Sequence, residues 1–277
     1  MTGLFHGVPR GRLWKRRAEG ERNFSACGRG AALQGGRVPR LMRVRFPPHE
    51  TPAALLHHMI VPYRVTTLTM RSPWANLALL AINVLMFVLL ASGALSEELI
   101  DRLVLSDWSP VGFIGYQFLH AGFFHLAGNM ILLWVFGNAL NGIMHDLDFV
   151  LAYLAMGVFA GALHLLVDGA PVVGASGAIS GLMGLYLAVY PKNEVSCFYW
   201  LLRFGTFEVK GYVLVIGWFA WDLISALRHV PGIACWAHVG GTLAGFGIGV
   251  LLLKLGRIHI GEYDNPTVLD LMSRQRD

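Results

Sequence analysis

The chain has 277 residues, of which 55% are hydrophobic and 14% are charged, and its formal net charge is +5. This composition is too apolar for an ordinary soluble domain and favours an integral membrane protein embedded in a lipid bilayer. The basic excess lies in residues 1–45, which hold 11 of the 22 Lys and Arg residues, and no nucleic-acid-binding fold accompanies it. The three cysteines are too few and too scattered to indicate a disulfide framework or a zinc site.

Residues 1–72 are rich in Arg and Gly, lack a sustained apolar period, and are predicted to form a disordered basic N-terminal tail. No apolar signal-peptide region lies near the start of this segment. Three interpretations stay open: a basic targeting segment, a tail that holds the N-terminus on the cytoplasmic side, or a start codon placed too early. The third is considered because Met59 and Met70 both lie close to the first apolar run.

Six apolar helices are predicted within a membrane domain of residues 73–256, followed by a short C-terminal tail of residues 257–277. Several of the runs reach the roughly 20 residues that cross about 30 Å of hydrocarbon. The expected fold is therefore an all-α integral membrane bundle of six transmembrane helices. The predicted helices span about 74–93, 116–138, 148–167, 175–190, 210–227 and 235–255.

The distribution of Lys and Arg over the connecting segments predicts the orientation of these helices. The N-terminal tail, which is strongly basic, should lie on the cytoplasmic side, and so should two segments that carry Lys or Arg: the 191–209 connection, with Lys192 and Arg203, and the C-terminal tail, with Arg257, Arg274 and Arg276. The 94–115 connection carries four acidic residues and one Arg, and should lie outside. With both termini cytoplasmic, the second, fourth and sixth helices all run from outside to inside.

Four polar side chains then reach similar depths below the outer surface. Ser176 opens the fourth helix within a Gly-Ala-Ser-Gly tetrapeptide, and His238 lies near the start of the sixth. A serine hydroxyl needs a base to take its proton, and histidine is the natural base near neutral pH. His125 and Asn129 share one face of the second helix, where both can donate hydrogen bonds to a developing oxyanion. The glycines of the fourth and sixth helices permit the close approach that such a site requires.

Each of these residues also has a purely structural interpretation. A serine between glycines is commonly a helix cap or packing site, and a membrane histidine or asparagine can simply bond a neighbouring helix. Their joint occurrence at one depth favours a functional site. Ser180 and His164 are better explained by packing and helix ends. Asp222 can either orient His238 or anchor the fifth helix, and we leave it out of the predicted site.

Three segments resemble the rhomboid family of intramembrane serine proteases. They are HAGFFHLAGN from His120 to Asn129, GASGAISG from Gly174 to Gly181, and AHVGGTLAG from Ala237 to Gly245. The resemblance implies a six-helix core and a dyad of Ser176 as nucleophile and His238 as general base, without an acidic third member. It also implies that His125 and Asn129 stabilise the oxyanion. The substrates would be single-span membrane proteins, cut in or near the membrane on the outer side, and no metal or cofactor would take part.

Two other functions remain to be compared with this prediction. A non-catalytic rhomboid-like protein would bind client transmembrane helices, but such proteins typically lose the serine or the histidine, and this chain keeps both. A small-solute transporter predicts paired internal repeats, which the sequence does not contain. The expected location is a bacterial plasma membrane with both termini cytoplasmic.

Overall fold

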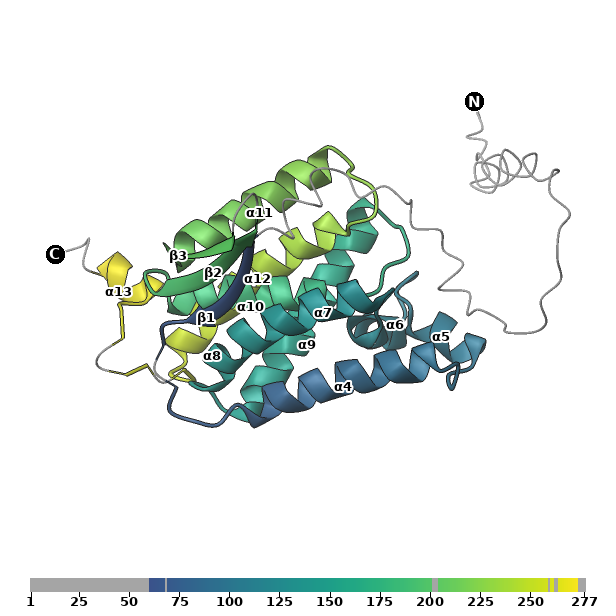
Figure 1. Cartoon of the computed structure of the whole chain (residues 1–277), viewed down its shortest axis with the longest axis horizontal. Coiled ribbons are helices and arrows are strands. Elements are labelled where there is room, and N and C mark those ends of the chain that lie inside the picture. The colour runs from purple at the N-terminus through teal and green to yellow at the C-terminus, as the bar shows by residue number, and fades with distance from the viewer. Residues whose placement is uncertain (1–59, 68, 201–203, 259, 262–263, 274–277) are drawn as a thin grey trace, which may run out of the picture. The chain divides into compact units, whose positions relative to one another are not determined.

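The structure, a computed structural model, describes residues 60–67, 69–200, 204–258, 260–261 and 264–273. Its apolar helices lie alongside one another, with a small sheet beside them (Figure 1). The longer helices are α4 (Trp74–Ala91), α9 (Asp146–Val167), α10 (Ser176–Val189), α11 (Gly211–Leu227) and α12 (Cys235–Lys254). Helix α7 (Phe123–Leu132) continues through a π-helical turn, η2 (Leu133–Gly137), into α8 (Asn138–Asn141). Short elements complete the helical part: α5 (Glu97–Leu103), α6 (Pro110–Gly115), the 3₁₀ turn η1 (Tyr116–Phe118) and α13 (Val268–Ser273).

Four helical segments within the described residues are long and apolar enough to cross a membrane. They are Trp74–Ala91, Phe123–Asn141, Asp146–Val167 and Cys235–Lys254, and the apolar helices α10 and α11 are shorter, with 14 and 17 residues. These segments agree with the predicted helical membrane fold, and four of the six predicted helices reach spanning length among the described residues. The second helix begins at Phe123 instead of 116, because the backbone is extended at Leu119 and at Gly122 and so separates η1 from α7.

Helix α10 lies at the centre of the bundle. Almost all of its residues from Gly177 to Val189 are buried, and it packs against α9, α11 and α12. Small residues allow this, since a Cβ at Gly181 would overlap Met156 of α9. The main apolar core surrounds α10 and includes Phe136, Phe149, Tyr153 and Tyr186.

A three-stranded antiparallel sheet, which the sequence analysis does not predict, lies beside the helices. It has the order β1 (Ile60–Val65), β2 (Glu194–Trp200) and β3 (Phe204–Lys210), so it joins the segment before α4 to the connection between α10 and α11. Residues 60–65 had been assigned to the disordered tail but form β1, whereas residues 1–59 of that prediction lie outside the described residues. β1 contacts α7 and η2, and the other two strands contact α11.

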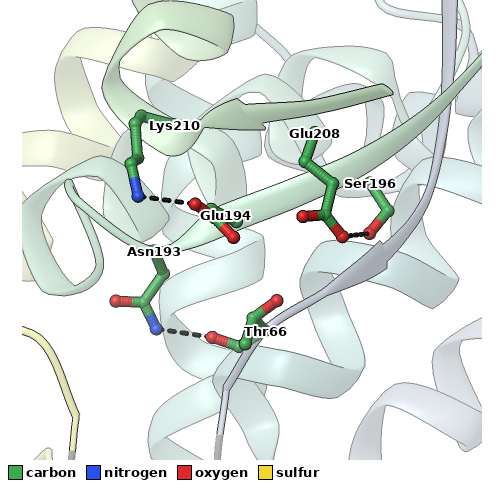
Figure 2. A network of polar contacts seen from close by, with 6 residues as sticks. All are labelled: Thr66, Asn193, Glu194, Ser196, Glu208 and Lys210. Carbon is green, nitrogen blue, oxygen red and sulfur yellow. Dashed lines mark hydrogen bonds and ion pairs between the residues drawn. The ribbon is translucent and has the colours of Figure 1, made fainter. Parts of the chain in front are cut away.

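Polar side chains fasten the sheet at the end nearest the bundle (Figure 2). Asn193 Nδ2 donates to the carbonyl of Thr66 at 2.6 Å, which links the two distant segments. Lys210 Nζ donates to Glu194 at 2.7 Å across the β2–β3 pair, and this contact lowers the pKa of the Glu194 carboxyl. The end of the sheet next to the helices is therefore stabilised by a partly buried hydrogen bond from Asn193 and by an exposed ion pair between Lys210 and Glu194.

Helix α4 is held to the second helical segment by buried asparagines. Asn76 Nδ2 donates to the carbonyl of Leu133 at 3.0 Å and to Asn138 Oδ1 at 2.8 Å, and the Asn76 N–H donates to Asn141 Oδ1 at 3.0 Å. Asn141 Nδ2 in turn donates to Asp146 at the start of α9. A Cβ at Gly137 would overlap the Asn76 side chain, so the two segments meet closely at this point.

Replacement of Asn76 by Ala is expected to destabilise the protein by about 1–3 kcal/mol, because it leaves buried polar partners unpaired. Unfolding in mixed detergent micelles, followed by circular dichroism, measures this loss. Asn83→Ala provides a comparison on the same helix, because the buried Asn83 side chain donates to the carbonyl of Leu79 and also interacts with Tyr153 of α9. A loss of less than about 1 kcal/mol in Asn76→Ala would contradict an interhelical role for Asn76.

Candidate active site

The serine of the predicted site opens the central helix. Ser176 is the first residue of α10, is half-buried, and follows Gly174, whose φ of +133° lies in a region that favours glycine. The N–H of Gly174 donates to the carbonyl of Tyr116 at 2.8 Å, which fixes this turn against η1. The first N–H groups of a helix have no acceptor within it, so those of α10 are available to an anion beside Ser176.

Glycines bring α12 into direct contact with α10. A Cβ at Gly241 would overlap the carbonyl of Gly177, and a Cβ at Gly245 would overlap the carbonyl of Gly181. Because these contacts advance in the same direction along both helices, α10 and α12 run parallel. His238 lies three residues before Gly241, on the same face of α12. This packing brings His238 to the end of α10 at which Ser176 lies.

The His238 ring is engaged by a carboxylate. Its Nδ1 lies 3.2 Å from Oδ1 of Asp222, a residue of α11 that is only 6% exposed. Among the described residues no hydrogen bond joins Ser176 to His238. Catalytic hydrogen bonds are often long before substrate binds and shorten in the complex, so this geometry does not remove His238 as the base.

His125 reaches the same region from α7, and Asn129, four residues later, shares its helix face. A Cβ at Gly174 would lie 2.8 Å from His125 Nε2 and 3.7 Å from Ser176 Oγ, so the imidazole of His125 and the hydroxyl of Ser176 flank one glycine. Asn129 is buried one turn further along α7, and its Nδ2 has no acceptor among the residues that the structure describes. Leaving a buried donor unpaired costs about 1–3 kcal/mol. A donor in this state suits an anion that forms only during a reaction.

Two residues near the site had no role in the prediction. Asp222 was left out, although its carboxylate contacts the predicted base. His120 is buried, and its ring meets that of His125 edge to face, with ring centroids 5.2 Å apart. The sequence motif contains His120 but indicates no role for it. The same sequence feature could have indicated a role for both residues. Each is an ionisable residue inside or beside an apolar segment, where its burial is costly.

The other polar residues weighed in the sequence have structural positions. His164 Nε2 donates to the carbonyl of Ala170 at 2.9 Å, just beyond the end of α9. Ser180 is buried on α10, one turn beyond Ser176. In the part of the chain that the structure describes, no group of three or more His, Cys, Asp or Glu residues has a metal-binding arrangement.

Comparison with known protein families identifies a matching domain that includes this site. The sequence profile of the rhomboid domain matches residues 107–255, which is more than half of the chain and includes the four predicted site residues. The chain belongs to the rhomboid family. Family membership and the four long apolar helices establish an integral, multi-pass membrane protein of rhomboid fold.

Several curated rhomboid proteins are similar to the chain. RHOMBOID-like protein 6, mitochondrial, from Arabidopsis thaliana is 29% identical over 190 residues, which cover 65% of this chain and 58% of the relative. Rhomboid protein 1, mitochondrial, from Saccharomyces cerevisiae is 29% identical over 191 residues, covering 64% and 53%. Rhomboid protease GluP from Bacillus subtilis is 32% identical over 133 residues, covering 48% and 25%.

The chain thus matches little more than half the length of the first two rhomboid relatives. The similarity shows a shared rhomboid domain. It does not show that this chain has the activity or the substrates of the full-length relatives. The expected bacterial plasma membrane gains no support from the relatives, because two of them are named as mitochondrial proteins.

Proposed function

We propose that the chain is an intramembrane serine endopeptidase that cleaves single-span membrane proteins in or near the bilayer, on the outer side. The observation that carries the proposal is that His125 and Ser176 flank Gly174, while the close packing of α12 on α10 brings His238 to the same end of α10. The rhomboid domain match and the similarity to a relative named as a rhomboid protease support it.

The proposed reaction is acyl transfer by the Ser176–His238 dyad. His238 takes the proton of Ser176 Oγ as that oxygen attacks the peptide carbonyl, and it then gives the proton to the leaving amine. Asn129 Nδ2, His125 and the free N–H groups at the start of α10 donate to the oxyanion of the tetrahedral intermediate. A water molecule, activated by His238, hydrolyses the acyl-enzyme and restores Ser176.

The substrate and the water must reach Ser176 by different means. Water is consumed in hydrolysis and is absent from hydrocarbon, so the site needs a polar opening to the outer aqueous side. A substrate helix must enter sideways and unwind locally, because an intact helix shields its peptide bonds. We expect the 94–115 segment and α11 to frame this route. Apolar side chains of the segment are exposed, as suits a position at the membrane interface: Leu99, Trp108, Val111 and Ile114.

The proposed topology has six membrane crossings, with α10 and α11 crossing as well as the four longer helices. Residues 73–256 would form the membrane domain, and residues 257–277 a C-terminal tail on the same side as the N-terminus.

Labelling with a fluorophosphonate tests the nucleophile. The purified wild-type protein in detergent is expected to be labelled at Ser176, and the Ser176→Ala variant is expected to show no labelling above background. Ser180→Ala is the matched control on the same helix, and its labelling should equal that of the wild type. Equal labelling of Ser176→Ala and wild type would overturn the assignment.

The alternative is a non-catalytic rhomboid-like protein that binds client transmembrane helices. Within the described residues no hydrogen bond joins Ser176 to His238, which is consistent with this alternative, whereas the presence of both residues favours the protease. A protein that binds a model transmembrane helix but neither cleaves it nor reacts with the fluorophosphonate would favour the alternative.

A further inference from the structure

Asp222 is a buried carboxylate in the apolar helix α11, and no contact within that helix accounts for its burial. It lies five residues before the end of α11, in a segment that is otherwise almost entirely apolar, and it is buried. A carboxylate near the C-terminus of a helix is opposed by the helix dipole. The α11 C-cap is made by the N–H of Arg228, which bonds carbonyls of Ile224 and Ala226, so Asp222 takes no part in it.

The contact that Asp222 makes is with the predicted base. Its Oδ1 lies 3.2 Å from Nδ1 of His238, and among the described residues Asp222 is the only carboxylate paired with this ring. The backbone of His238 is held separately, because Thr242 Oγ1 donates to the His238 carbonyl at 3.0 Å. A buried ionisable residue within an apolar helix is costly, and a specific partner is the usual reason for its presence.

We propose that Asp222 is a positioning residue that accepts a hydrogen bond from Nδ1–H of His238 and thereby keeps Nε2 of the imidazole unprotonated toward Ser176. The inference rests on the proposed protease function. A neutral imidazole carries one proton, and the bond made by one nitrogen decides which nitrogen can act as a base. The rhomboid resemblance implies a dyad, so this chain would have a dyad supported by a third residue.

The proton balance of this arrangement is simple. The Ser176 proton moves to His238 Nε2 during attack, and it leaves from the same atom to the departing amine. Asp222 keeps its negative charge throughout, accepts no proton, and stabilises the imidazolium while it exists. Its effect should therefore fall on the chemical step more than on substrate binding.

Asp222→Asn tests this role with little change in shape. An asparagine amide can donate to Nδ1 and so favour the wrong tautomer of His238. We expect kcat for a model single-span substrate to fall by about 10²–10⁴-fold, with KM within about twofold of the wild type. The fluorophosphonate labelling rate of Ser176 should fall in parallel. Asp222→Glu is expected to recover part of the lost kcat, because it restores a carboxylate.

Ser225→Ala is the matched control, since Ser225 is a small polar residue buried almost one turn further along α11. Its kcat and labelling rate should equal those of the wild type. Full activity of Asp222→Asn, or a loss confined to KM or to folding and matched by Ser225→Ala, would overturn the inference.

The ¹⁵N NMR spectrum of histidine-labelled protein gives a second readout that needs no turnover. His238 in the wild type should carry its proton on Nδ1, and the Nε2–H form should grow in Asp222→Asn. An unchanged tautomer in the variant would contradict the positioning role even if the wild type cleaves its substrate. If the wild type neither cleaves nor labels but shows this tautomer change, the contact stands and the proposed protease function fails.

Discussion

Reconstituted with a single-span membrane protein in liposomes, the wild-type chain is expected to produce two fragments, while Ser176→Ala and His238→Ala each reduce the cleavage rate by about 10⁴-fold or more. The losses should be of similar size in both variants. Nucleophile and base act as one unit, so removing either one disables the same step.

The same assay separates the oxyanion donors from the dyad. Asn129→Ala should retain measurable cleavage, because the loss of one donor reduces kcat by about 10²–10³-fold. Fragment mapping by mass spectrometry locates the cut, which we expect near the outer side of the bilayer. Cleavage by Ser176→Ala at the wild-type rate would exclude the proposed mechanism, and wild-type binding without cleavage would favour the non-catalytic alternative.

Replacement of Gly245 by Ala is expected to destabilise the bundle by about 3 kcal/mol and to reduce cleavage by about 10²-fold. A Cβ at this position would overlap the carbonyl of Gly181, and the overlapped atoms are backbone, so the two helices must separate. Separation of α10 and α12 also displaces His238 from the end of α10 that carries Ser176. Misplacement of a catalytic group by about 1 Å is enough for a rate loss of this size.

Gly247→Ala provides the comparison for this prediction. A Cβ at Gly247 would have open space around it, and both variants gain the same helix propensity. Its stability should equal or exceed that of the wild type by up to about 1 kcal/mol. Chemical unfolding in mixed micelles and the liposome assay measure the two effects. Equal stability of the two variants would show that close contact at Gly245 is not needed.

The helices and the residues of the proposed site could be selected from the sequence because their signals are local. An apolar run identifies a helix, and a serine or histidine inside such a run is conspicuous whatever surrounds it. Glycine spacing on α10 and α12 further indicated which helices approach each other, and Gly177 and Gly241 do meet. The family profile covers the same segments.

The features that were missed depend on contacts between distant parts of the chain. Strand β1 pairs with β2 across more than 120 residues, and its short sequence before α4 carries no sign of that partner. Asp222 could not be assigned because either role, anchoring α11 or orienting His238, fits its position in the sequence. The break between η1 and α7, where the backbone is extended at Leu119 and Gly122, interrupts a run that the sequence pattern predicts as one helix.

The pairing of β1 with β2 restricts how many times the chain can cross the membrane between these two strands. Two strands that pair must lie on one side of the membrane, so an even number of crossings must separate them. Three of the long helical segments lie between β1 and β2: α4, the segment from α7 to α8, and α9. If all three cross the membrane, as proposed, this rule requires α10 to cross as well.

An isolated β-bridge also joins Met144 to Ile258. The helices between these two residues, α9 to α12, must therefore also cross the membrane an even number of times. If α9, α10 and α12 cross, α11 must cross as well. These backbone pairings therefore support the six crossings of the proposed topology, including the two helices that are too short to qualify by length. The bridge between Leu105 and Val172 agrees, because two crossings separate its ends.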